Sequence, residues 1–243
     1  MTGSAAAPLA GVAAVVTGAS RGIGLATTRA LVRAGARVAM LARHAEPLEA
    51  RARELGDGAV AIPCDVTDRD QVTRAIARIV NELDEAPAIL VNNAGLFSLA
   101  RVEDTTPHDF ACAIDVNLVA PFLLARAFLP EMRARGRGHI VTVGSVADRV
   151  AYPENGAYAA SKYGARALHE VLRAELRGTG VRASLVSPGP TDTEMWDPVR
   201  PEERPGFTPR SAMLGADAVA DAILYVVTRD ASVNVDELRL THS

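Results

Sequence analysis

Residues 12–24 read VAAVVTGASRGIG, an apolar run that passes into a glycine-rich turn, and a predicted helix follows over residues 23–34. The spacing of Gly18, Gly22 and Gly24 suits a tight turn whose backbone a phosphate can approach closely. Backbone N–H groups at the start of the following helix would then face the negative charge. We therefore expect a phosphate-binding turn here, and an ordinary glycine-rich strand–helix turn is the alternative.

Outside this turn, short apolar runs alternate with helical patterns along the chain. Nearly continuous apolar runs are typical of parallel strands buried on both faces. The alternation predicts a single α/β domain with a doubly wound parallel sheet of about seven strands, and a ligand crevice at the carboxyl ends of the strands. The predicted strands are residues 12–16, 37–42, 60–63, 89–91, 139–143, 182–186 and 235–240. The predicted helices are residues 23–34, the segment after the N-cap Asp68 to Leu83, and residues 107–135, 158–178 and 216–228.

Composition narrows the class of protein. With 243 residues, 49% of them hydrophobic, the chain has enough apolar side chains for one domain core. A net charge of −3 gives no indication of nucleic-acid or membrane binding, and no apolar run approaches the length of a membrane span. Residues 1–10 are expected to be a flexible tail rather than part of a signal peptide.

The cysteines and histidines suggest a reducing compartment and no metal. Cys64 and Cys112 form neither a CxxC pair nor a disulfide framework, so a cytoplasmic location is expected. The five histidines lack the spacing of metal ligands.

One lysine stands out. Of 26 Lys and Arg residues, only Lys162 is a lysine, so a role that arginine cannot fill is suspected. Tyr158 lies four residues earlier and therefore on the same face of the predicted helix. A neighbouring ammonium would lower the pKa of the tyrosine from about 10 toward neutral, which suits a general acid/base. The alternative is that the four-residue spacing between Tyr158 and Lys162 arises by chance.

The end of the second predicted strand bears on the choice of nucleotide. A site for NAD usually carries an acidic residue about 20 residues after the glycine turn. Here the strand ends in Arg43, and no acid occurs before Glu46. Arg43, with Arg21 from the glycine turn, favours the 2′-phosphate of NADP(H), unless Arg43 is merely a solvated surface residue.

At this point the chain resembles the short-chain dehydrogenase/reductase family over nearly its whole length, from about Gly11 to Leu240. The resemblance rests on several motifs in the family's order: TGASRGIG at 17–24, CDVTD at 64–68, NNAG at 92–95, YAASK at 158–162 and SPGPTDT at 187–193, together with Asn117 and Ser145. It implies a Rossmann-type fold and an enzyme that interconverts a carbonyl and an alcohol.

The resemblance also implies roles for individual residues. Ser145, Tyr158, Lys162 and Asn117 match the family's catalytic residues, with Asn117 holding a water through its backbone. Lys162 would also bind the nicotinamide ribose, and Thr191 the carboxamide. The full set of residues matching cofactor contacts is Gly18, Ser20, Arg21, Gly22, Ile23, Gly24, Arg43, Asp65, Val66, Asn92, Ala94, Gly95, Tyr158, Lys162, Pro188, Gly189 and Thr191.

Two departures from the family pattern matter. The chain ends in VNVDELRLTHS rather than a glycine-rich strand, which weakens carry-over of the usual tetramer contacts. Gly144 precedes Ser145 where a second serine is frequent, which removes one possible polar contact near the substrate.

Substrate recognition is expected to depend on two segments, residues 146–156 and the proline-rich residues 188–211, here called the lid. Candidate wall residues are Tyr152, Met195 and Trp196. Arg149, Arg200 or Arg210 could meet a substrate carboxylate, although a solvated position is the more common fate of an arginine.

These patterns predict an NADP(H)-dependent carbonyl reductase that acts on a small molecule and forms a homo-oligomer, a dimer or a tetramer. One alternative is an NAD(P)-dependent 3-hydroxy-acid or alcohol dehydrogenase that works in the oxidative direction. A non-catalytic NADP-sensing protein on the same fold is an alternative of another class.

Overall fold

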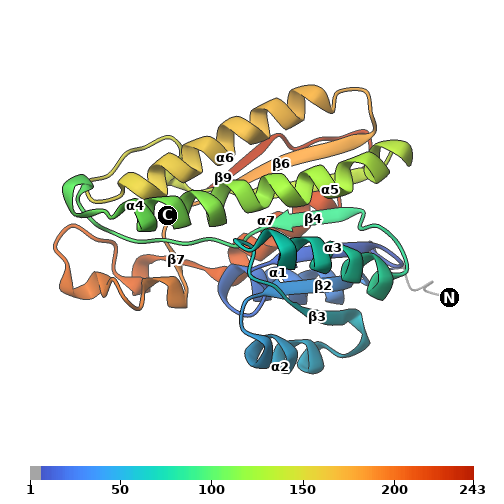
Figure 1. The fold of residues 1–243 in the computed structure, drawn as a ribbon, viewed down its shortest axis with the longest axis horizontal. Coiled ribbons are helices and arrows are strands. Elements are labelled where there is room, and N and C mark those ends of the chain that lie inside the picture. The colour runs from blue at the N-terminus through green and yellow to red at the C-terminus, as the bar shows by residue number, and fades with distance from the viewer. Residues whose placement is uncertain (1–6) are drawn as a thin grey trace.

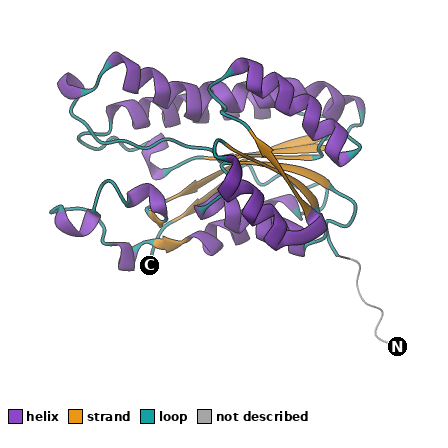
Figure 2. Cartoon of the chain, turned by 60° about the horizontal axis from the view of Figure 1, so that its bottom comes forward, coloured by secondary structure: helices purple, strands orange, loops and turns teal. Residues whose placement is uncertain are grey.

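The computed structural model describes residues 7–243. Its centre is a seven-stranded parallel sheet in the order β3-β2-β1-β4-β5-β6-β9, with helices packed on both faces (Figures 1 and 2). This arrangement confirms the predicted doubly wound α/β fold. The strands are β1 Ala13–Thr17, β2 Arg37–Ala42, β3 Ala59–Pro63, β4 Ile89–Asn92, β5 Gly138–Val143, β6 Val181–Pro188 and β9 Glu237–Leu240.

The helices follow the predicted ranges closely, with one exception. Helix α2 (Ala45–Leu55) has no counterpart in the prediction, because it buries only Leu48 and Ala52 and its apolar stripe is too short to recognise. The other helices are α1 Gly22–Arg33, α3 Arg69–Leu83, α4 Pro107–Ile114, α5 Ala120–Ala134, α6 Gly156–Glu175 and α7 Ala216–Val227. Asp68 is the N-cap of α3, as expected, and accepts hydrogen bonds from the N–H groups of Asp70 and Gln71.

Successive strand residues point to opposite faces of the sheet and build two cores. On one face, Val16, Met40 and Val186 pack with residues of α1 and α7. On the other face, Val15 and Leu41 belong to a second core with residues of α3 and α5. Because both faces of the sheet are covered, the carboxyl ends of the strands are left as the place for a site.

One long helical segment corrects an expectation about membrane spans. Helices α4 and α5 join through a π-helical turn, Asp115–Val119, and the resulting segment Pro107–Ala134 is long and apolar enough to cross a membrane by length and composition. Two of its apolar side chains, Phe128 and Met132, lie fully buried in the core beside the sheet. The apolar face of a core helix passes the same test as a membrane span. The sequence predicted a helix of this length, over residues 107–135, but showed no apolar run as long as a membrane span because proline and charged residues interrupt it.

The expectation of a flexible tail over residues 1–10 is wrong for its last part. Residues 1–6 lie outside the described residues, but Leu9 is buried in the core, and its N–H donates to the carbonyl of Ala34 at 2.8 Å.

The lid contains more structure than a plain loop. Strand β7 (Thr191–Asp192) pairs with β8 (Leu214–Gly215), and short 3-10 turns cover Glu194–Trp196, Pro201–Glu203 and Arg210–Ala212.

Candidate active site

The glycine-rich turn connects β1 to α1 and has the geometry that close approach of a ligand requires. Gly18 and Gly22 have φ of +65° and +53°, in the left-handed region that glycine tolerates. A side chain at Gly24 would collide with the carbonyl oxygen of Gly18, so only glycine fits. No side chain caps the start of α1, which leaves its first N–H groups available for an anion.

The ends of β1 and β4 are tied together behind this turn. The Thr17 hydroxyl accepts hydrogen bonds from the N–H groups of Asn93 and Ala94 at 3.0 and 2.8 Å. The Asn93 side chain donates to the Thr17 carbonyl at 2.8 Å. Sequence reasoning named the neighbours Asn92, Ala94 and Gly95 but not Asn93, whose contribution depends on contacts with a strand 76 residues away. Asn92 is buried, and its Oδ1 has no partner among the described residues.

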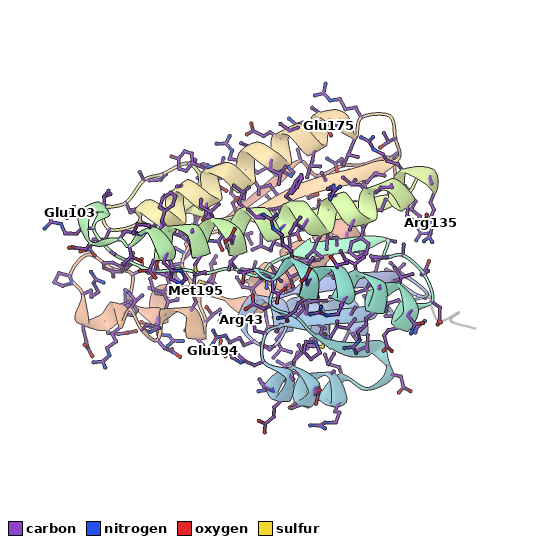
Figure 3. All side chains as sticks on the ribbon, viewed as in Figure 1. Arg43, Glu103, Arg135, Glu175, Glu194 and Met195 are labelled. Carbon is purple, nitrogen blue, oxygen red and sulfur yellow. The ribbon has the colours of Figure 1, made fainter. Side chains whose placement is uncertain are left out.

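The residues expected near the nucleotide's adenosine half lie at the neighbouring strand ends. Arg21 and Arg43 are exposed, and neither forms an ion pair with a carboxylate of residues 7–243. Figure 3 shows Arg43 and, from the lid, Glu194 and Met195. One carboxylate oxygen of Asp65 is already hydrogen-bonded within its own turn: its Oδ1 accepts from the N–H and the hydroxyl of Thr67 at 2.9 and 2.8 Å. Val66 is buried beside it.

Three predicted catalytic residues converge at the carboxyl end of β5, on the edge of the sheet that also carries the glycine turn. Ser145 follows β5, whereas Tyr158 and Lys162 lie on one face of α6. The Lys162 Nζ is 5.6 Å from the centroid of the Tyr158 ring and donates to the carbonyl of Val143 at 2.9 Å. The Ser145 Oγ accepts a hydrogen bond from the N–H of Ala147 at 3.1 Å. Ser145 lies close enough to Tyr158 to favour its phenolate and so to lower its pKa.

The electrostatics of this group correct one expectation. The pKa of Tyr158 is raised to about 12, because burial disfavours the phenolate more than the nearby Ser145 favours it. Burial also lowers the pKa of Lys162 to about 8. The prediction that Lys162 brings the Tyr158 pKa toward neutral is therefore wrong, because the Lys162 ammonium bonds to the Val143 carbonyl and desolvation dominates the pKa of Tyr158.

Asn117 lies in the π-helical turn and is buried. Its Oδ1 accepts from the Leu96 N–H at 2.8 Å, and its Nδ2 donates to the Leu96 carbonyl at 2.9 Å and the Ser161 hydroxyl at 2.8 Å. The side chain thus joins the segment after β4 to α6 directly beside Lys162. Irregular turns of this type inside helices are frequent at functional sites.

A buried carboxylate that the sequence did not single out lies beside Ser145. Asp148 has no exposed surface, and its Oδ2 accepts from the Ser187 hydroxyl at 2.6 Å. Arg149 donates to Asp148 Oδ1 at 2.7 Å and bridges to Glu237 of β9 at 2.7 Å. This network, Ser187–Asp148–Arg149–Glu237, joins the catalytic loop to the edge strand, and the negative charge of Asp148 raises the pKa of both Tyr158 and Lys162.

The start of the lid is attached to the sheet. The Gly189 N–H donates to the Leu240 carbonyl at 2.8 Å, and the Thr191 hydroxyl donates to the Gly189 carbonyl at 3.0 Å. Pro188 and Thr191 are buried. Thr193 lies against the glycine turn, because its Cγ2 is 3.0 Å from the position of a Cβ built at Gly22.

The arginines considered for a substrate carboxylate are engaged elsewhere. Arg149 belongs to the Asp148 network, and Arg210 binds Asp192 and Asp197 at 2.5 and 2.7 Å. Arg200 lies on the surface beside Glu203.

The candidate wall residues divide into two groups. Trp196 packs on Phe97, which in turn packs on Tyr158, whereas Tyr152 is about half exposed and has no aromatic partner among the described residues. Met195 is also partly exposed, with its Cε 3.7 Å from a Cβ built at Gly95. Phe97 was missed, because a lone phenylalanine after NNAG gives no sequence signal.

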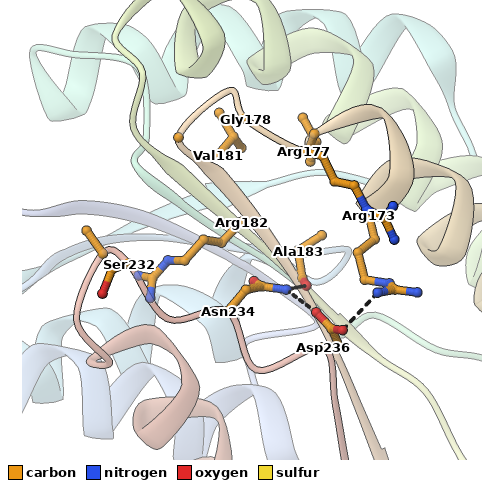
Figure 4. A pocket seen from close by; sticks show the side chains of 12 residues that line it. Arg173, Arg177, Gly178, Val181, Arg182, Ala183, Ser232, Asn234 and Asp236 are labelled. Atoms are coloured by element: carbon orange, nitrogen blue, oxygen red, sulfur yellow. Dashed lines mark hydrogen bonds and ion pairs between the residues drawn. The ribbon is translucent and has the colours of Figure 1, made fainter.

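A separate cavity of about 390 Å³ opens at the opposite end of the sheet, near the start of β6 (Figure 4). Arg173 there pairs with Asp236 at 2.8 Å, and Arg182 donates to the carbonyls of Val227, Arg229, Asp230 and Val233. None of the residues predicted for the site lines this cavity.

Known proteins resemble this chain along most of its length. The model of the short chain dehydrogenase family matches residues 12–204. A glycine betaine reductase of Emericella nidulans is 35% identical over 237 residues, which are 95% of this chain but only 19% of that protein. An uncharacterized oxidoreductase of Staphylococcus haemolyticus is 32% identical over 95% of this chain and 96% of its own length.

Solved structures are similar as well. A metagenomic short-chain oxidoreductase in complex with NADP is 34% identical, with a TM-score of 0.83 over 97% of this chain and 99% of that one. The closed form of serine dehydrogenase complexed with NADP+ is 30% identical, with a TM-score of 0.86 over 94% of both chains.

The buried network leads to a prediction about stability. Asp148→Ala leaves the Ser187 hydroxyl and one side of Arg149 without their partner, so it should lower the free energy of unfolding by about 3 kcal/mol. Urea-induced unfolding at neutral pH measures the loss. The control is Glu103→Ala, which removes an ion pair with Arg101 whose side chains are 66% and 70% exposed and should cost less than about 0.5 kcal/mol. Equal effects of the two substitutions would contradict the importance of the network.

Proposed function

Because the chain belongs to the short-chain dehydrogenase family, whose members are oxidoreductases of alcohols and carbonyls, we propose that it is an NADP(H)-dependent carbonyl reductase. The observation that carries this proposal is the convergence of Ser145, Tyr158 and Lys162 at the carboxyl edge of the sheet, the same edge that carries the glycine turn. A non-catalytic NADP-sensing protein would not need a proton donor there.

The three residues have distinct roles in the proposed reaction. The Tyr158 hydroxyl donates its proton to the carbonyl oxygen, and the Ser145 hydroxyl orients the same oxygen. Lys162, 5.6 Å from the ring centroid, stabilises the phenolate that remains. Bound at the glycine turn, the nicotinamide cofactor supplies the hydride. Burial raises the pKa of Tyr158 to about 12, so at neutral pH it carries the proton that reduction requires it to donate.

The residues of the turn fit a dinucleotide phosphate. Only glycine fits at position 24, because any Cβ there would collide with the Gly18 carbonyl oxygen, and no side chain caps the start of α1. Together these two features form a cradle for a pyrophosphate. Arg21 and Arg43 are exposed and have no carboxylate partner among residues 7–243, which suits a 2′-phosphate. Two similar structures are complexes with NADP or NADP+, which supports the same nucleotide for this chain.

A homo-oligomer is part of the proposal. Helices α4, α5 and α6 leave large apolar side chains exposed on their outer surfaces, among them Phe110, Phe122, Tyr163 and Val171. Apolar side chains gathered on neighbouring helices are typical of subunit interfaces. This surface supports association of identical chains into a dimer or a tetramer.

The proton donor is tested by Tyr158→Phe, which keeps the ring and removes the hydroxyl. Turnover of carbonyl compounds with NADPH should fall by at least about 10²-fold, because general acid catalysis is lost. Binding of NADPH, followed by fluorescence titration, should be retained. A purified variant with near-normal turnover would refute the assignment.

Lys162 leads to a prediction about pH. Its ammonium form is required to stabilise the phenolate, and its pKa is lowered to about 8, so kcat/KM for reduction should decline as the pH rises through about 8. Asp148→Asn removes a negative charge that raises this pKa, and should move the decline to lower pH. Lys162→Arg should be slower, because the planar guanidinium is misplaced, and should keep its remaining activity to higher pH. Identical pH profiles for the three proteins would argue against this role of Lys162.

Cofactor choice is tested at the end of β2. Charge-assisted bonds from Arg43 to a 2′-phosphate are worth about 1.5–3 kcal/mol, so NADPH should exceed NADH in kcat/KM by at least about tenfold. Arg43→Ala should remove most of this difference by weakening NADPH alone, and adding Ala42→Asp should shift preference toward NADH. Steady-state kinetics with both nucleotides provide the measurement. Equal use of the two by the unmodified protein would show that Arg43 is only a surface residue.

A further inference from the structure

An aromatic cluster covers the proposed proton donor. The Phe97 ring centroid is 4.9 Å from that of Tyr158, with an interplanar angle of 79°, and 5.1 Å from that of Trp196, with an angle of 59°. The three rings come from the segment after β4, from α6 and from the lid, so they meet only in the folded chain. A carbonyl group that reaches the Tyr158 hydroxyl must therefore lie next to aromatic carbon.

The polar atom of this cluster's largest ring is already satisfied. The Trp196 Nε1 donates to the Thr191 carbonyl at 3.0 Å, which holds the indole through a bond within the lid. Both Phe97 and Trp196 are only partly buried, and the neighbouring Met195 contributes a further apolar side chain. The cluster thus offers apolar ring surface, with no free hydrogen-bond donor on Trp196, to a molecule that enters beside Tyr158.

The arginines around the cluster are all paired with carboxylates. In the lid and in residues 146–156, every arginine has a carboxylate partner: Arg149 pairs with Asp148 and Glu237, Arg200 with Glu203, Arg204 with Glu154, and Arg210 with Asp192 and Asp197. The lid also contains five acidic residues against three arginines. A substrate carboxylate would therefore meet a net negative lid and no arginine of these two segments that lacks a carboxylate partner.

Four of the five acids of the lid are engaged, and the fifth, Glu194, lies toward the glycine turn. Among the acids of the lid, Asp192, Asp197 and Glu203 are ion-paired. Glu202 accepts a hydrogen bond from the Arg210 N–H at 3.1 Å. Glu194 lies on the side of the glycine turn, with its Oε2 3.7 Å from a Cβ built at Gly22.

We propose that Phe97 and Trp196 select an uncharged carbonyl compound that carries a flat apolar group on a short chain from the reacting carbon, and that hydroxy and keto acids are poor substrates. This inference rests on the proposed function, because it describes the substrate of the same Tyr158. Ring contacts supply the attraction, and burying a substrate charge without a partner is unfavourable.

Three methyl ketones of similar length test the proposal: 4-phenyl-2-butanone, methyl 4-oxopentanoate and 4-oxopentanoate. With NADPH, kcat/KM should be highest for the phenyl ketone and at least about tenfold lower for the carboxylate. A second pair compares trimethylammonioacetaldehyde with its neutral isostere 3,3-dimethylbutanal, which should be the better substrate. Higher kcat/KM for the carboxylate or for the cation than for its neutral counterpart would overturn the proposal.

Variants assign the preference to the two rings. Phe97→Ala and Trp196→Ala should each reduce the ratio of kcat/KM between the phenyl ketone and the methyl ester by at least about threefold, mainly through KM. The matched control is Tyr225→Ala, which removes an exposed aromatic ring of α7 and should leave the ratio unchanged. An unchanged ratio in both ring variants overturns the assignment of specificity. Failure of all five compounds to be reduced would contradict the proposed function itself, and the two failures are thus distinguishable.

Discussion

The Thr17 hydroxyl holds the site together, because it accepts hydrogen bonds from two successive N–H groups at the end of β4. Strand order places β1 beside β4, and the connections from these strands run to different places in the sheet. Chain segments diverge at such a point and leave a crevice at the carboxyl edge. The glycine turn borders it on one side and the segment with Phe97 on the other, so both the phosphate cradle and the aromatic cluster depend on this contact.

Much of the fold was predictable because its signals are local. Buried parallel strands are continuous apolar runs, and the glycine turn is visible as a spacing. The residues that the sequence missed act through contacts with distant segments: Asn93 with β1, Asp148 with Ser187, and Phe97 with the lid. Nothing in a single asparagine, aspartate or phenylalanine distinguishes these positions before the chain folds.

Gly144 illustrates how a departure from a family pattern acquires a structural reason. From sequence alone, glycine in place of a second serine is a lost polar contact. In the structure, a Cβ at this position would lie 2.5 Å from the Ser187 Oγ and 2.8 Å from Asp148 Oδ2. The space next to the strand is thus taken by a buried hydrogen bond, and glycine is the residue that leaves room for it.

The carboxylate of Asp148 also affects the protonation states of Tyr158 and Lys162. Burial alone disfavours both charged forms, raising the Tyr158 pKa and lowering the Lys162 pKa, so it would leave a neutral phenol beside a neutral amine at mildly alkaline pH. The negative charge of Asp148 raises both values. It therefore opposes the effect of burial on the lysine and adds to that on the tyrosine. The combination that results, a protonated phenol beside an ammonium, is the one that donates a proton to a carbonyl oxygen and then stabilises the phenolate.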